Sequence, residues 1–437
     1  METENRKGPK LTIRLNFPEA ITEIEDLRIP LPDGTRLSAR VWMPESAATR
    51  PVPAVLEYIP YRKRDGTLPR DELMHPYVAG HGYACVRVDI RGNGDSEGLM
   101  EDEYSAQELQ DACDVIAWLA RQDWCSGTVG MMGKSWGGFN CLQTAFLQPP
   151  ALKAVISVYS TTDRFADDIH FKGGALLGEN FGWGSVMLSY TSRPGDPVLH
   201  NHWREDWLKR LEAQPFHAPG WASHQSRDAY WKHGSICEDW DRMVVPVLSF
   251  GGWNDNYMNT VAALMENARG PVKGIIGPWV HQYPHTAVPG PKIGFLQLAI
   301  RWWDRWLKGV ENGAEADPAF RAYMLHSAPP NPSAVHRDGH WIAETEWPTP
   351  RVSRRVLMVS DEGLGVAGPL SASVCTAQHL GMAAGEFFPM GLNAEMAGDQ
   401  RGDDALSVCF DGAVLEEPLE LLGAAKLSLR LSSDKPL

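Results

Sequence analysis

Short apolar runs alternate with amphipathic helical patterns along most of the chain. Residues 24–44 alternate between apolar and polar positions around Pro32-Asp33-Gly34, which predicts a β-hairpin. Runs rich in β-branched residues predict buried strands at residues 52–60, 83–90, 128–134, 152–158, 244–250 and 273–276. Apolar residues at helical spacing predict helices at residues 108–122, 139–147, 261–268 and 295–307. Strands that alternate with helices are typical of a parallel sheet with helices on both faces.

Two stretches depart from this alternation. Between residues 160 and 243 the chain carries six tryptophans and helical patches such as residues 203–211, which predicts a mostly helical insertion over the sheet. From about Pro318 the pattern changes to short strands with polar turns, typical of an all-β module of the sandwich type. The strands expected in that module are residues 321–325, 340–343, 355–359, 405–410 and 426–431.

The predicted fold class is therefore α/β with added domains. Residues 20–160 and 244–317 form the two parts of the α/β core, residues 161–243 a helical cap, and residues 318–437 a C-terminal β domain. The length of 437 residues agrees with two or three domains of ordinary size.

The composition of the chain disfavours some classes of binding partner. The formal net charge of −14 disfavours phosphate backbones and anionic lipid surfaces, so neither a nucleic acid nor a membrane is expected as partner. The first residues lack the apolar core of a signal peptide, and no run of apolar residues is long enough to span a bilayer. The seven cysteines are scattered without a CxxC pair, which argues against structural zinc and a disulfide framework. These features predict a cytoplasmic protein that acts on a small molecule and needs no cofactor.

The strongest local motif is a G-x-S-x-G sequence at residues 133–137. It lies between a predicted strand and a predicted helix, where a nucleophile elbow exposes its serine on a sharp turn. Glycines two residues on either side of Ser135 let the strand and helix approach closely. Ser135 is therefore the candidate nucleophile, and the alternative is an ordinary loop with a buried serine.

A nucleophilic serine needs a base and an orienting carboxylate, in the chain order Ser, Asp or Glu, His. Asp255 and His281 each follow the carboxyl end of a predicted strand, where open α/β sheets place their sites. Asp239 and Asp241 are rivals, but they precede their strand, and His285 lies farther from the sheet. A metal pair of His281 and His285 lacks a third ligand nearby.

The tetrahedral intermediate of acyl transfer also needs hydrogen-bond donors. The backbone N–H of Trp136, directly after the nucleophile, is one candidate. Tyr61 stands at the end of the strand at residues 52–60 and is either a second donor, through its phenol, or a packed aromatic side chain.

Taken together, the motifs resemble those of the cocaine esterase/NonD (CocE/NonD) family of Xaa-Pro dipeptidyl-peptidase-like hydrolases. The resemblance rests on residues 133–138, Gly-Trp-Asn-Asp at 252–255, Gly-Pro-Trp-Val-His at 277–281, Pro60-Tyr61, and residues 91–98 and 303–309. It implies an α/β-hydrolase core, a helical cap and a C-terminal jelly roll, of which this chain is expected to hold only a part. It also implies that Tyr61 and the Trp136 amide form the oxyanion hole.

The residues and the resemblance together favour a serine hydrolase that cleaves a carboxylic ester or amide. The cap tryptophans suggest an apolar or aromatic substrate group. An Xaa-Pro peptide or an α-amino acyl ester or amide is the alternative, for which Asp167, Asp168 and Glu179 are candidate partners of the amino group, although solvated cap residues are their ordinary interpretation. A hydrolase-like scaffold that binds ligands without turnover is a further hypothesis, and a homo-oligomer is possible.

Overall fold

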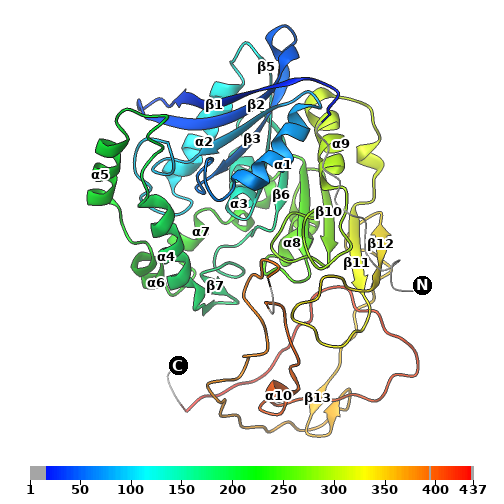
Figure 1. Cartoon of the computed structure of the whole chain (residues 1–437). Helices are drawn as coiled ribbons and strands as arrows, with labels where there is room; N and C mark the ends of the chain where they lie inside the picture. Colours follow the sequence, from blue (N-terminus) through cyan, green and yellow to red (C-terminus); the bar gives the residue numbers. More distant parts are fainter. Residues whose placement is uncertain (1–15, 393–394, 435–437) are drawn as a thin grey trace, which may run out of the picture.

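A ten-stranded sheet forms the centre of the computed structural model, which describes residues 16–392 and 395–434 (Figure 1). The strand order is β1-β2-β4-β3-β5-β6-β9-β10-β11-β12, and all neighbours from β4 to β11 run parallel. The first eight strands are β1 (Ile21–Pro30), β2 (Arg36–Pro44), β3 (Val52–Ile59), β4 (Ala84–Asp89), β5 (Cys125–Lys134), β6 (Leu152–Val158), β9 (Val247–Gly252) and β10 (Val272–Gly277). The predicted hairpin and the predicted buried strands are confirmed, with ends that differ by a few residues.

Helices cover both faces of this sheet, as expected for parallel strands. The predicted helices are found as α2 (Ala106–Leu119), α3 (Trp136–Leu147), α8 (Asn259–Asn267) and α9 (Phe295–Lys308). Within β5, a Cβ at Gly130 would meet Trp303 of α9, whereas a Cβ at Gly133 would meet the backbone of α3. Because these two positions point to opposite faces of a strand, α9 and α3 lie on opposite sides of the sheet.

One helix of the core is not predicted by the sequence pattern. Helix α1 (Leu68–Ala79) contains Pro69 in its first turn and Pro76 in its interior. Proline is tolerated in the first turn but removes a hydrogen bond from a helix interior, so the sequence disfavours a helix here. Within residues 16–392 and 395–434, every helix is too short or too polar to traverse a lipid bilayer.

Most of the regular structure between β6 and β9 is helical, as predicted. It contains α4 (Glu179–Thr191), α5 (Trp203–Ala213), α6 (Ala218–Ser223) and α7 (Ala229–Lys232), together with the short hairpin of β7 (Phe171–Lys172) and β8 (Ala175–Leu176). Trp221 and Trp231 are fully buried and pack with Phe171 in a small cluster of their own. The cap limits of 161 and 243 stay a prediction.

The C-terminal strands differ from the prediction. β11 (Phe320–Leu325) pairs parallel with β10, and β12 (Gly339–Glu344) pairs antiparallel with β11, so both extend the main sheet. Of the later strands only a two-residue pair is formed, β13 (Val359–Ser360) with β14 (Gly363–Leu364). Residues 405–410 and 426–431 are not strands, and the described residues after β12 do not form the expected sandwich.

The physical reason is the lack of strand partners. Alternation of apolar and polar residues produces a strand only where a neighbour supplies hydrogen bonds and covers the apolar face. Leu427 and Leu431, on one face of the predicted last strand, are 69% and 85% exposed. The strands predicted at residues 405–410 and 426–431 are therefore wrong, whereas the incomplete β module as a whole stays a prediction.

Candidate active site

Ser135 occupies the sharp turn between β5 and α3. Its backbone has φ 57° and ψ −124°, a region that non-glycine residues rarely adopt. The turn is held because the Ser135 N–H donates to the carbonyl of Val158 at 2.9 Å. A strained backbone that is held in this way is typical of functional sites and corresponds to the predicted nucleophile elbow.

The glycines of the motif permit this turn. A Cβ at Gly133 would stand 2.6 Å from the backbone of Gly137, and a Cβ at Gly138 would stand 2.8 Å from the carbonyl oxygen of Val158. Both contacts are with backbone atoms, which cannot move aside as a side chain does. The small residues around Ser135 are therefore required by the close approach of strand and helix.

Asp255 and His281 are brought together by the loops that follow β9 and β10. The Nδ1 atom of His281 lies 2.5 Å from Oδ2 of Asp255, and both side chains are buried. The second carboxylate oxygen of Asp255 accepts the Tyr257 N–H at 2.9 Å. With Nδ1 donating to Asp255, the Nε2 atom of His281 is left as the basic nitrogen.

Their two loops interlock through short contacts. The Asn254 N–H donates to the carbonyl of Trp279 at 3.2 Å, and the Asn254 side chain donates to the carbonyl of Pro278 at 2.6 Å. A Cβ at Gly252 would stand 2.2 Å from the carbonyl oxygen of Trp279. The Gly-Trp-Asn-Asp and Gly-Pro-Trp-Val-His motifs therefore form two loops that pack directly against each other, which explains why they contain these residue types.

Burial lowers the pKa of His281 below its ordinary value, because a charged imidazole is poorly solvated there. Asp255 opposes this shift, and the positive charge of Lys134 adds to it. His281 is thus neutral at physiological pH, as a general base must be.

The rival residues Asp239, Asp241 and His285 are not part of the hydrogen-bonded pair, although His285 lines the same cavity as His281. Asp241 forms an exposed ion pair with Arg269 at 2.7 Å, and the Asp239 side chain accepts from the Asp241 backbone N–H. His285 is buried and stacks on Phe295, and neither of its ring nitrogens has a hydrogen-bond partner in the described part of the chain. None of the three contributes to the hydrogen bond that Asp255 makes with His281.

The candidate oxyanion donors lie beside Ser135. As the first residue of α3, Trp136 has a backbone N–H without an intrahelical acceptor. The Tyr61 ring packs edge-on against Trp136 at 6.4 Å between centroids. Burial raises the pKa of the Tyr61 phenol well above its usual range, so it stays protonated and can donate.

Sequence reasoning missed Glu108, which fixes the indole of Trp136. The Trp136 Nε1–H donates to Oε1 of Glu108 at 2.6 Å, and the Tyr104 N–H donates to Oε2 at 2.8 Å. Burial raises the pKa of Glu108 to about 8. Only the helical spacing of α2 was visible in the sequence, and it did not distinguish this buried carboxyl from a solvated one.

Ser135 and His281 both line a cavity of about 790 Å³. Its wall also contains Tyr61, Trp183 and Phe388, and is mainly apolar. Of the six cap tryptophans, all of which the structure describes, Trp183 alone lines this cavity. The suggestion of an apolar or aromatic substrate group therefore draws on one cap tryptophan and not on all six.

A segment far along the chain also reaches the cavity. The His281 backbone N–H donates to the carbonyl of Pro389 at 2.9 Å, and the Phe388 ring lies 5.3 Å from the His281 ring. The sequence carries no motif for this contact, which joins residues that lie far apart in the chain.

Asp168 belongs to the wall of the cavity, which differs from one interpretation of the sequence. Asp168 is 1% exposed and lines the cavity, as does Glu179, so the interpretation of Asp168 as a solvated cap residue is wrong. Its Oδ2 atom has no hydrogen-bond partner among the described residues, and burial raises the pKa of its carboxyl. Asp167, in contrast, pairs with Lys172.

Glu103 stands near Asp168 but is already compensated. Its carboxylate lies 2.5 Å from Nε2 of His170 and accepts the Trp183 Nε1–H at 3.0 Å. Of these two carboxyl groups, Asp168 is therefore the one with an oxygen that lacks a partner among the described residues.

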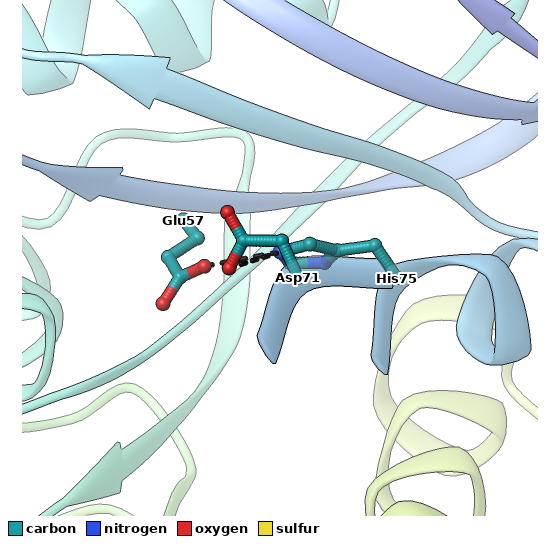
Figure 2. Close-up of side chains that lie close together, drawn as sticks. All are labelled: Glu57, Asp71 and His75. Atoms are coloured by element: carbon teal, nitrogen blue, oxygen red, sulfur yellow. Dashed lines mark hydrogen bonds and ion pairs between the residues drawn. The ribbon is translucent and has the colours of Figure 1, made fainter. Parts of the chain in front are cut away.

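Figure 2 shows the one group of possible metal ligands found among residues 16–392 and 395–434, which consists of Glu57, Asp71 and His75. Nη2 of Arg70 already binds Glu57 at 2.7 Å, and Nε of Arg87 lies 3.4 Å from Asp71. Burial opposes ionisation of Glu57, but these guanidinium groups and His75 lower its pKa overall. Two guanidinium groups repel a metal ion, so the cluster is an ion-pair network that joins α1 to β3 and β4.

Comparison with protein families gives two matches. The model of X-Pro dipeptidyl-peptidase (S15 family) matches residues 33–283, which is more than half of the chain. The model of the X-Pro dipeptidyl-peptidase C-terminal non-catalytic domain matches residues 312–437.

Similar proteins include esterases and peptidases. Cocaine esterase of Rhodococcus sp. (strain MB1 Bresler) is 26% identical and aligns with 93% of this chain and 77% of its own length. A putative Xaa-Pro dipeptidyl-peptidase of Streptomyces avermitilis is 24% identical over 67% of this chain and 42% of its own length.

Solved structures share the fold. A CocE/NonD family hydrolase from Staphylococcus aureus superposes with a TM-score of 0.64 at 18% identity, over 79% of this chain and 60% of that one. An α-amino acid ester hydrolase gives a TM-score of 0.60 at 20% identity, over 93% and 73%. The chain thus spans less than two thirds of the first of these structures.

Proposed function

The chain belongs to the X-Pro dipeptidyl-peptidase (S15) family of hydrolases, and we propose that it cleaves small carboxylic esters through an acyl-enzyme on Ser135. The observation that carries this proposal is the hydrogen-bonded pair of His281 and Asp255, whose imidazole opens on the same cavity as Ser135. A nucleophile on a strained turn beside a base with its own orienting carboxylate is the arrangement that acyl transfer needs.

The reaction begins when Oγ of Ser135 attacks the substrate carbonyl carbon. Nε2 of His281 takes the hydroxyl proton, and Asp255 stabilises the imidazolium that forms. The same proton then passes to the leaving alcohol as its bond to the carbonyl carbon breaks. In deacylation, Nε2 of His281 takes a proton from water, which attacks the acyl carbon, and the proton passes to Oγ of Ser135 as the bond between Oγ and the acyl carbon breaks and the acid is released.

The oxyanion of each tetrahedral intermediate is stabilised by two donors in this proposal. One is the Trp136 backbone N–H at the amino end of α3, where the helix dipole also favours negative charge. The other is the Tyr61 hydroxyl, which burial keeps protonated. The apolar wall around Trp183 and Phe388 favours an apolar acyl or leaving group.

The test is labelling with a fluorophosphonate together with turnover of p-nitrophenyl butyrate. Wild-type protein should be labelled on Ser135, and Ser135→Ala should lose both labelling and turnover. Ser126→Ala, which changes an exposed serine on the same strand, serves as the matched control and should retain both. Turnover at the wild-type rate in Ser135→Ala, or labelling at another residue, would refute the proposal.

A second candidate substrate class is favoured by Asp168. Its unpartnered, buried oxygen at the cavity wall suits a positively charged amino group, as in an α-amino acyl ester or amide or an Xaa-Pro peptide. Asp168→Asn should then lower kcat/KM for a phenylalanine methyl ester at least tenfold more than for the 3-phenylpropionate methyl ester, which lacks the amino group. Equal losses on the two esters would exclude this recognition.

A further inference from the structure

Lys134 occupies the variable position directly before the nucleophile, and the acyl-transfer steps above give it no role. Its Nζ atom donates to the backbone carbonyl oxygen of His281 at 2.7 Å. The side chain also lines the cavity that holds Ser135. A lysine at the end of β5 thus reaches across to the loop after β10 and contacts the residue that carries the base.

The ammonium group of Lys134 stands in an unfavourable environment. Burial lowers its pKa to about 8, and the positive charge of Arg70 on α1 adds to the shift. The buried carboxylates of Asp255 and Glu57 oppose this lowering of the Lys134 pKa. Burying an ammonium group in this environment costs desolvation free energy, which suggests that Lys134 has a role in the site.

The charges that act on His281 are few. Asp255 and Lys134 are the charged groups that shift its pKa, and they act in opposite directions. The other titratable neighbours are Tyr159 and Tyr257, whose rings lie 5.5 and 5.9 Å from the imidazole. Burial raises the pKa of both phenols well above the usual range, so neither carries a charge at neutral pH.

We propose that Lys134 is a positioning residue of the reaction, which anchors the backbone of His281 and keeps its imidazole in the unprotonated form. Without this charge, burial alone would oppose the carboxylate of Asp255, the pKa of His281 would rise, and more of the imidazole would be protonated at mildly acidic pH. The proposal rests on the proposed function, because it requires His281 to be the base for Ser135.

The test is the pH dependence of fluorophosphonate labelling, measured as a second-order rate constant from pH 4.5 to 8. In Lys134→Met the pH of half-maximal labelling should rise by about half to one unit, the size expected for one charge several ångströms away in a partly buried site. Lys134→Arg keeps the charge and should stay within about 0.2 units of wild type. Lys292→Met, which removes a charge that acts on His285 and not on His281, is the matched control and should also be unshifted.

An unshifted Lys134→Met would overturn the proposal, as would an equal shift in Lys134→Arg. If Lys134→Met fails to fold by circular dichroism, Lys134→Gln replaces it, since its amide can still donate to the His281 carbonyl. Failure of the proposed function gives a different result, because Ser135→Ala would then still be labelled.

Discussion

Gly133→Ala is the sharpest perturbation of the nucleophile turn. The added methyl group would stand 2.6 Å from the carbonyl carbon and Cα of Gly137, where 3.4 Å or more is ordinary. Since no side chain can rotate away, β5 and α3 must separate by about 0.8 Å. Overpacking of this kind costs about 1–3 kcal/mol, and a displacement of about 1 Å at a reacting group costs about 10²-fold in rate.

The assay compares kcat/KM for p-nitrophenyl butyrate with the melting temperature. Gly133→Ala should lose about 10²-fold in kcat/KM while the protein remains folded, because Ser135 and the Trp136 amide move together. Gly220→Ala in α6 is the control, since a Cβ there meets nothing within 4 Å. Wild-type kcat/KM in a folded Gly133→Ala would refute the argument that close packing sets the position of the nucleophile.

Three further predictions concern the reacting groups. Asp255→Asn should lower kcat about 10³–10⁴-fold with little change in KM, because the imidazole loses its orienting acceptor. Tyr61→Phe should lower kcat about 10²–10³-fold and leave fluorophosphonate labelling specific to Ser135, since one oxyanion donor is removed. The acylation rate should rise with pH through the pKa of His281. Because burial lowers that pKa, the pH of half-maximal acylation should lie below about 6.5. A midpoint above about pH 7 would contradict the argument that burial lowers the pKa of His281.

The central sheet could be predicted because its signals are local. Buried parallel strands such as β3 and β6 consist mostly of apolar residues, and the glycines around Ser135 mark a turn that depends on nearby backbone. The contact between Asp255 and His281 could also be predicted, since chain order and the ends of strands confine both residues to two short loops.

The remainder depends on contacts between distant segments. Asp168 and Glu108 could not be distinguished from solvated acids, because their burial is produced by packing against residues far away in the sequence. The alternation at residues 405–410 predicts a strand only if a partner strand is adjacent. Helix α1 was hidden by its two prolines, and its place is set by the ion pairs of Arg70 and Asp71 with the sheet.

The pairing of β11 with β10 determines where this chain can be divided. The match to the C-terminal non-catalytic domain begins at residue 312, yet β11 protects the open edge of β10, the strand that leads to His281. A cut before β11 would leave the hydrogen-bonding groups of Gly274–Ile276 exposed and available to another chain. A unit separated from the rest of the chain must therefore include at least β11 and β12, which lie inside the match to the C-terminal non-catalytic domain.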